Sequence, residues 1–352
     1  PFLLPRGNLS GSADGYFSLT GSPDEPLLNG QFSTADMQYT DQERINQLGT
    51  VSLSIDYEDR MLRFPVLSLE TPLGAASASI AYPIDLSWGN PHTPVEEQFT
   101  ASMDMDHLAI APLRNFIPII PPDLDGTISG YVEVKGPVTR PEDMAGFIAV
   151  DSLRLFGLQN ELVNEDSLHV RFNAAYADLD TATITLRRLN QPSEDLGHIE
   201  AAGRYAFRTR NGASEESDFT ITTRHMSLEA LLALMGQDLA LTGTLDSDIE
   251  ITGSGSLKSW DTRIKLDRMS YNEAAVDSIE SRVVYEYGDL VIHDFQTWFK
   301  DRTLVAYGTI PFNPDNTDGS SEMDNMAITV EGEDLDLSFL SGIIYDLERV
   351  RG

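Results

Sequence analysis

Apolar and polar residues alternate with a period of two along most of the chain. In one such stretch, Ile128, Val132 and Val134 occupy one set of alternate positions, whereas Tyr131 and Glu133 occupy the other. Alternation of this kind indicates strands with one dry face and one wet face. Antiparallel pairing fits best, because parallel strands need long crossover connections and are usually apolar on both faces.

Signals for other elements are few. Ser227–Met235 predicts a short helix, with Ser227 as the N-cap, an apolar body and Gly236 as the stop signal. The pair Asn29-Gly30 predicts a turn between strands, and the polar segment Arg187–Asp195 predicts a loop insertion.

The sequence repeats itself about every 115 residues. The segments LSGSADGYFSLTG from Leu9, LDGTISGYVEVKG from Leu124 and LTGTLDSDIEITG from Leu241 align without a gap. Each carries two glycines ten residues apart, which we expect to be structural: Gly11 and Gly21, Gly126 and Gly136, Gly243 and Gly253. Three matching segments in this spacing predict a repeat protein.

Two further matches follow in the same order in each repeat. They start at Ala76, Ile199 and Leu304 for the second match, and at Phe99, Phe219 and Ala327 for the third. We therefore expect a first β repeat over residues 1–98, a second over 99–218, a third over 219–326 and the start of a further repeat over 327–352.

One-sided strands with hardly any helix leave an apolar face that must be kept from water. Two sheets could close on each other as a sandwich, or one sheet could curl into a trough that takes a guest. Repeats that contact only their neighbours favour the trough. The predicted fold is therefore all-β: an elongated, curled antiparallel β-sheet groove of about three repeats, with short capping helices at most. The side chains expected to face the groove are Val132, Val134, Ile148, Val150, Phe172, Ile184, Ile249, Ile251 and Val283.

Charge and composition exclude several classes of function. Asp and Glu number 56 against 24 Lys and Arg, a net charge of −32. Nucleic acid is excluded as a partner, because binding phosphates needs basic residues, and an anionic membrane surface is disfavoured for the same reason. Only four of the basic residues are Lys. A surface that is poor in Lys and rich in Asp and Glu stays hydrated at high ionic strength, which suggests a halophilic source.

No pattern in the sequence predicts an enzyme. The chain has no Cys, its six His are scattered without metal-binding spacing, and no nucleophile elbow or phosphate-binding loop occurs. The acidic segment Asn313–Asn325 fails the calcium-loop pattern at its first and twelfth positions. We therefore expect no catalytic residues, no metal site and no cofactor.

The pattern L-x-G-x-x-x-G-x-V-x-V-x-G, followed by Pro and G-x-I-x-V, is clearest over Leu124–Val150. It resembles the AsmA-like superfamily, most closely the TamB type, the inner-membrane component of the translocation and assembly module. The resemblance covers essentially the whole chain and implies a periplasmic β-groove of a diderm bacterium. Such a bridge-like lipid-transfer protein conducts phospholipid between the inner and outer membranes in outer-membrane biogenesis. The implied partners are phospholipid acyl chains and an outer-membrane barrel protein of the assembly module.

Full-length members of that family have an N-terminal membrane anchor, whereas no apolar run here approaches 18 residues. We therefore expect these residues to be an excerpt of a longer protein, with the anchor in the inner membrane outside it. Two other functions stay open from the sequence. One is an assembly factor for outer-membrane or autotransporter proteins that templates strands on an exposed sheet edge. The other is a structural spacer or adhesin with a closed core.

Overall fold

The structure is a computed structural model of the 352-residue chain. It describes residues 8–41, 44–72, 74–87, 98–110, 124–157, 159–207, 215–237, 239–254, 258–271, 274–286, 288–299, 302–311 and 327–332. These residues form 19 β-strands, one α-helix and a short 3-10 turn, η2 (Pro141–Asp143), and every recorded strand pairing is antiparallel. The predicted all-β, antiparallel fold class is confirmed.

The chain divides into two units. Unit 1 comprises residues 1–155 and 166–174, and unit 2 comprises residues 156–165 and 175–352. The strands of unit 1 are β1 (Asn8–Gly21), β2 (Pro26–Asp41), β3 (Arg44–Glu58), β4 (Met61–Thr71), β5 (Gly74–Pro83), β6 (Gln98–Ala109), β7 (Asp125–Pro137), β10 (Leu168–Phe172) and most of β8 (Ala145–Gly157).

Unit 2 holds the remaining strands and the helix α1 (Leu228–Leu234). Its strands are β9 (Asn160–Asn164), β11 (Tyr176–Arg188), β12 (Gln191–Ala206), β13 (Ser217–Ser227), β14 (Leu241–Gly253), β15 (Ser259–Tyr271), β16 (Ala274–Glu286), β17 (Asp289–Phe299), β18 (Arg302–Pro311) and β19 (Ala327–Gly332).

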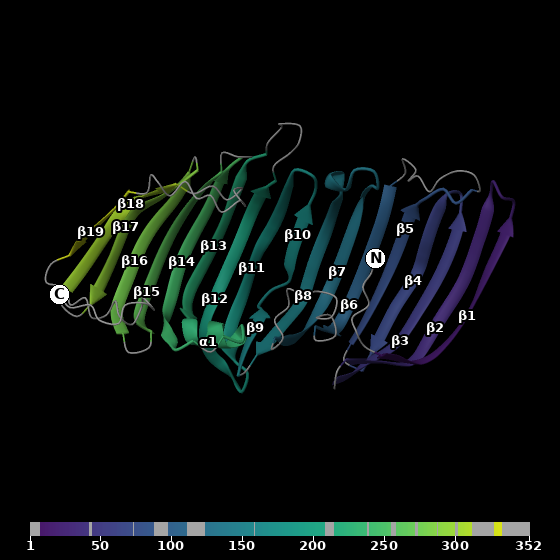
Figure 1. Cartoon of the computed structure of the whole chain (residues 1–352), viewed down its shortest axis with the longest axis horizontal. Coiled ribbons are helices and arrows are strands. Elements are labelled where there is room, and N and C mark those ends of the chain that lie inside the picture. The colour runs from purple at the N-terminus through teal and green to yellow at the C-terminus, as the bar shows by residue number, and fades with distance from the viewer. Residues whose placement is uncertain are drawn as a thin grey trace. The chain divides into compact units, whose positions relative to one another are not determined.

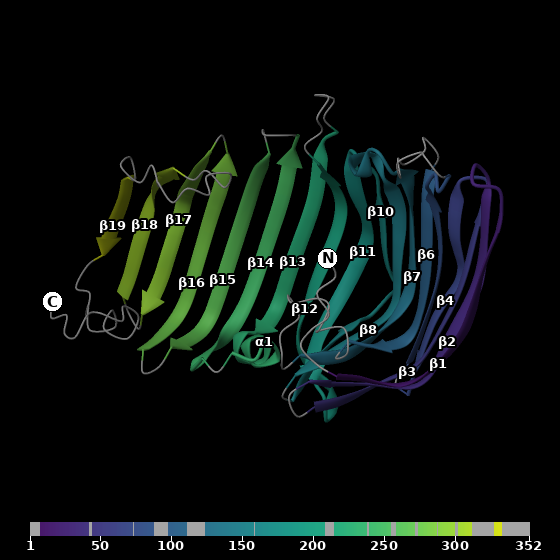
Figure 2. The same ribbon diagram turned by 45° about the vertical axis from the view of Figure 1, so that its right-hand side comes forward.

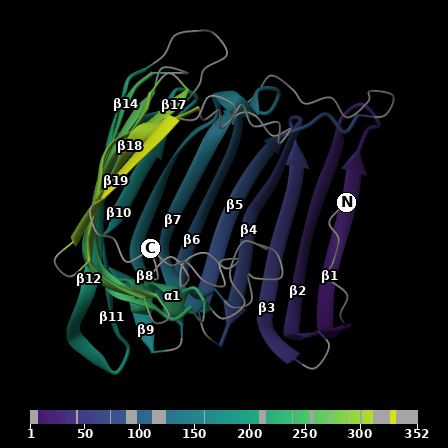
Figure 3. The same cartoon turned by 60° about the vertical axis from the view of Figure 1, so that its left-hand side comes forward.

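Each unit is an antiparallel meander in a single layer. In unit 1, β1 to β7 pair in chain order and β8 pairs with β10, whereas in unit 2, β9 pairs with β11 and β11 to β19 pair in chain order. Figure 1 shows the strands side by side in this order. The strands of unit 1 bend along their length, so that its sheet is curled (Figure 2). Figure 3 shows β1 to β7 as one layer of strands.

The predicted helix is confirmed. The Ser227 hydroxyl accepts a hydrogen bond from the Ala230 N–H at 3.2 Å, which satisfies one of the free amides at the start of α1. The helix buries Ala230 and Leu234. It packs on β14, β9 and β13, at the end of the unit 2 sheet where β13 ends and β14 begins (Figure 2).

The repeated segments occupy corresponding strands. The first match lies in β1, β7 and β14, the second in β5, β12 and β18, and the third in β6, β13 and β19. Counted from one first match to the next among the described strands, the first repeat has six strands, β1 to β6, and the second has seven, β7 to β13. The predicted repeat boundaries stay a prediction from the sequence.

The strand register corrects the alignment of the third match. Phe99 lies opposite Gly136 in β7, whereas Ser217 lies opposite Gly253 in β14. Since Gly136 and Gly253 are equivalent in the repeat, Phe99 corresponds to Ser217 and not to Phe219. Aligning the Phe-Thr pairs of the two segments shifts the alignment by two residues. A shift of two residues keeps each side chain on the same face of the sheet and therefore leaves the alternation unchanged.

Two of the repeat glycines lie opposite β-bulges. Gly11 and Gly243 have φ values of 143° and 138°, and the bulges lie on β2 and β15. A Cβ on Gly243 would lie 3.1 Å from the Met269 Cα, closer than nine in ten real Cβ contacts. Glycine is therefore the residue that lets the bulged strand approach here.

One predicted turn and one predicted loop insertion are wrong. Asn29-Gly30 lies inside β2, and Gly30 makes room for the Phe17 ring, which lies 2.3 Å from where a Cβ would be. The predicted loop Arg187–Asp195 is a hairpin, because β11 runs to Arg188 and β12 begins at Gln191. Polar composition suggested a loop at this position, but a two-stranded ribbon exposed to water tolerates the same residues.

Candidate functional site

The apolar face of unit 1 carries five of the nine predicted groove residues: Val132 and Val134 on β7, Ile148 and Val150 on β8, and Phe172 on β10. Val132 lies opposite Met103 of β6, and Ile148 lies opposite Val170 of β10. Residues directly opposite in an antiparallel pair project from the same face. The register therefore builds continuous apolar rows across β6 and β7, and across β8 and β10.

The apolar face of unit 2 carries the other four: Ile184 on β11, Ile249 and Ile251 on β14, and Val283 on β16. Ile249 lies between Ile221 of β13 and Thr262 of β15, and Thr262 in turn lies opposite Val283. On the other side, Ile184 lies opposite Ile199 of β12. The structure brings these four onto one face of one sheet.

None of the nine residues is buried. All are half-buried, although a second sheet packed on this face would remove such side chains from water. In the described part of each unit the strands lie in one layer, and only α1 and short connecting segments lie against a face (Figures 1 and 2). An apolar face that keeps its contact with solvent is the feature of this molecule that can receive an apolar ligand.

The repeat places equivalent residues on this face in both units. Val132 and Val134 precede Ile249 and Ile251 by 117 residues, and Phe17 and Leu19 of β1 occupy the same places in the first match. Phe17 and Leu19 are 61% and 73% exposed, because β1 pairs only with β2 among the described strands.

One end of the unit 2 face is closed. Leu186 and Met226 have no exposed area there, and the Asn160 Nδ2 donates a hydrogen bond to the Ala230 carbonyl of α1 at 3.3 Å. Leu234 on the helix is buried as well. The half-buried surface therefore begins beyond α1 and extends toward the opposite ends of the strands.

In unit 1 a hollow of about 430 Å³ opens on the apolar face near the β1–β2 turn. Its walls include Leu19, Leu28, Tyr57 and Leu86. The Leu86 N–H donates to the Tyr57 hydroxyl at 2.9 Å and holds the segment after β5 across the end of β3.

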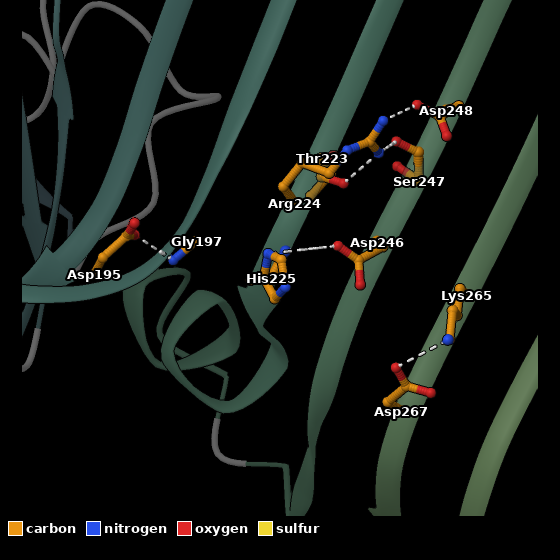
Figure 4. Close-up of polar contacts among 10 residues, drawn as sticks. All are labelled: Asp195, Gly197, Thr223, Arg224, His225, Asp246, Ser247, Asp248, Lys265 and Asp267. Carbon is orange, nitrogen blue, oxygen red and sulfur yellow. Dashed lines mark hydrogen bonds and ion pairs between the residues drawn. The ribbon is translucent and has the colours of Figure 1, made fainter.

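The opposite face of unit 2 is polar and tied together by ion pairs between strands (Figure 4). Arg224 of β13 pairs with Asp248 of β14 and also donates to the Ser247 carbonyl at 3.0 Å. Lys265 Nζ lies 3.5 Å from an Asp267 carboxylate oxygen and 3.6 Å from one of Glu280. The nearby Asp267 charge raises the pKa of Lys265, and Glu280 adds to the effect.

The most regular of these pairs joins β15 and β16. Arg282 donates two hydrogen bonds to the Asp261 carboxylate, at 3.1 and 2.7 Å. The hydrogen bond to Arg282 lowers the pKa of Asp261, against a smaller opposing effect of burial. Because each such surface pair contributes at most about 1 kcal/mol, their main effect is to fix which face meets water.

Sequence reasoning missed a bulge that occurs in both units. His107 and His225 have φ values of 48° and 52°, at bulges in β6 and β13 that share the same register shift. Each is followed by an apolar residue that is buried, Leu108 or Met226. The His225 N–H donates to an Asp246 carboxylate oxygen at 2.8 Å (Figure 4). A correct alignment of the third match would have revealed this His-Leu/Met pair.

The described residues contain no group of three or more His, Cys, Asp or Glu side chains placed to hold a metal ion. In the same residues, no helix has the length and apolar character needed to cross a membrane. Comparison with protein-family models, with curated proteins and with solved structures finds no match for this chain.

Proposed function

We propose that the chain is a bridge-like lipid-transfer protein whose apolar sheet face holds phospholipid acyl chains and conducts them between two membranes. The observation that carries the proposal is the half-buried apolar face, repeated in both units. A spacer or adhesin with a closed core has no need of such a face, and its core side chains would be buried.

The energetics of lipid transfer favour a continuous apolar surface. Exposing an acyl chain to water costs about 0.8 kcal/mol per CH₂, so some thirty methylenes cost on the order of 25 kcal/mol. A surface that contacts the acyl chains along the whole route removes most of this barrier. Transfer of this kind breaks no covalent bond and requires no cofactor.

The polar face contributes by exclusion. Its charged side chains keep it hydrated, and the chain's net charge of −32 repels anionic headgroups. Lipid therefore has one favourable side of the sheet to occupy.

The resemblance to AsmA-like proteins of the TamB type supports a location for this activity. On that ground we propose that the chain lies in the periplasm of a diderm bacterium, as part of a protein anchored in the inner membrane, and serves outer-membrane biogenesis. A barrel protein of the assembly module would be the partner at the outer membrane.

A transfer assay tests the proposal. Donor vesicles carry a self-quenched fluorescent phospholipid, and the 352-residue chain is expected to accelerate its appearance in unlabelled acceptor vesicles. Ile249→Asp and Val132→Asp place a charge in the apolar path and should reduce the rate several-fold. Thr252→Asp is the matched control, because Thr252 lies on β14 next to Ile251 but on the polar face. Equal rates for all variants would contradict the proposal.

A second candidate function rests on the sheet edge. All six residues of β19 are exposed, and among the described strands β19 pairs only with β18. Such an edge can accept a further strand, as an assembly factor for outer-membrane or autotransporter proteins would require. Capture of an unfolded barrel precursor that is lost when Val330→Pro blocks the edge would favour this function.

A further inference from the structure

The two ends of the unit 2 strands differ in chemistry. At the end where β13 passes into β14, α1 packs against β9, β13 and β14, and both Met226 and Leu186 are buried. At the other end, where β12, β14 and β16 finish and β15 begins, the face carries a row of amphipathic aromatic side chains. We name this row the aromatic rim and define it as Tyr205, Trp260 and Tyr285.

The register places the aromatic rim on the apolar face. Trp260 lies opposite Ile251 of β14 on one side and Tyr285 of β16 on the other. The Trp260 and Tyr285 rings are 5.3 Å apart between centroids, and Trp260 is 37% exposed. Tyr and Trp prefer such boundaries, because the ring packs on apolar surface while the polar group stays in water.

A lysine lies beside the aromatic rim. Lys258 lies just before β15, and its Nζ is 3.7 Å from the centre of the Tyr205 ring and donates to the Ala206 carbonyl. Among the described residues no carboxylate lies within ion-pair distance of Lys258, whereas Lys265 on the polar face has Asp267 and Glu280. Lys258 therefore places a positive charge at the border of the apolar face, in a chain that has 56 acidic residues.

The span between the two ends matches one layer of lipid. Along β14, Leu245 lies opposite the buried Met226 near α1, and Ile251 lies opposite Trp260. The six residue steps from Leu245 to Ile251 cover about 20 Å at roughly 3.4 Å per step. One leaflet of a bilayer contributes half of a hydrocarbon core of about 30 Å, or about 15 Å. An acyl chain laid along the strands therefore fits between α1 and the aromatic rim.

We infer that unit 2 binds glycerophospholipid in one orientation, with the acyl chains directed toward α1 and the headgroup phosphate at Lys258 and the aromatic rim. This inference rests on the proposed function and adds a polarity to it. Charge complementarity favours the aromatic rim for the headgroup, because the phosphate is anionic and the Lys258 ammonium lies against the Tyr205 ring at this end of the strands. At the opposite end, α1 and the buried apolar residues Met226 and Leu234 receive the ends of the acyl chains.

Tryptophan fluorescence tests the orientation. The chain has three Trp, and Trp88→Phe with Trp298→Phe leaves Trp260 as the reporter. Phosphatidylcholine with a nitroxide on its headgroup is compared with the same lipid labelled at the acyl chain end. We expect the headgroup label to quench Trp260 at least twofold more strongly. A Trp298 reporter, made with Trp88→Phe and Trp260→Phe, is the control, because Trp298 lies opposite Ser278 on the polar face and should respond to neither label.

A charge variant provides a second measurement. Lys258→Gln should weaken binding of the headgroup-labelled lipid about fivefold, the usual upper range for a partly exposed charge pair. Lys265→Gln, on the polar face, should leave binding unchanged.

The outcomes separate this inference from the proposed function. Stronger quenching by the chain-end label, equal quenching by both, or lipid retained on gel filtration without quenching of Trp260 would overturn the orientation and leave lipid binding in place. Absence of retained lipid would overturn the orientation and the proposed function together.

Discussion

Ile249→Asp separates an open apolar face from a covered one by its effect on stability. Ile249 is half-buried, so the substitution forfeits only part of the 1.5–3 kcal/mol that full burial of an Ile contributes. The new carboxylate keeps contact with water and avoids most of the cost of an isolated buried charge. We expect the free energy of unfolding to fall by about 2 kcal/mol or less.

Met226→Asp is the matched comparison. Met226 lies on the neighbouring strand and the same face but has no exposed area, since α1 packs at this end. Losing a fully buried Met side chain costs about 2–5 kcal/mol, and an unpaired buried charge adds to it, so the expected loss is about 4 kcal/mol or more.

Urea unfolding followed by circular dichroism measures the loss of stability in both variants. With a slope of about 3 kcal/mol per molar urea, the midpoint should fall by roughly 0.7 M or less for Ile249→Asp and by more than about 1.3 M for Met226→Asp. If Ile249→Asp lowers the midpoint as much as Met226→Asp, the side chain is covered and the reasoning fails.

Three further predictions concern the charged face, the helix and salt. Asp261 has a folded-state pKa below its ordinary 3.8, so its pair with Arg282 stabilises the protein above about pH 4, and this contribution is lost as the pH falls through the lowered value. Asp261→Asn should therefore lower the free energy of unfolding at pH 6 by at most about 1 kcal/mol and leave it unchanged at pH 2. A larger loss at pH 2 than at pH 6 would show that the effect does not come from this ion pair. Ser227→Ala removes the N-cap of α1 and should cost about 1 kcal/mol in urea unfolding, with Ser227→Thr restoring most of it; no difference between Ala and Thr would show that the hydroxyl does not cap the helix. Because the chain has a net charge of −32, raising NaCl from 0.1 to 1 M should raise the melting temperature by screening the repulsion between its negative charges. Sucrose is the uncharged control, and a melting temperature that NaCl leaves unchanged would contradict this prediction.

The alternation of residues was enough to predict the architecture. Val132 and Glu133 point to opposite sides because a strand has a period of two, and no tertiary information is needed to assign them to two faces. The helix at Ser227 was equally local, since its cap and its apolar body lie within nine residues. These features depend on neighbours in sequence, which is why they could be predicted.

What depended on neighbouring strands was missed. The bulges at His107 and His225 involve positive φ angles that residues other than glycine seldom adopt, and only the pairing with β7 and β14 reveals them. Gly30 was predicted to be in a turn, although it is needed where the Phe17 ring crosses β2. Lys258 was overlooked, because its approach to Tyr205 and Ala206 joins residues 53 and 52 positions apart.

The central claim is that the apolar face holds phospholipid acyl chains. Gentle purification of the 352-residue chain, followed by organic extraction and mass spectrometry, tests it most directly. We predict phospholipid in a reproducible ratio to protein, strongly reduced in Val132→Asp and Ile249→Asp and retained in Thr252→Asp. A stable protein that carries no lipid, or lipid retained equally by all variants, would contradict the claim.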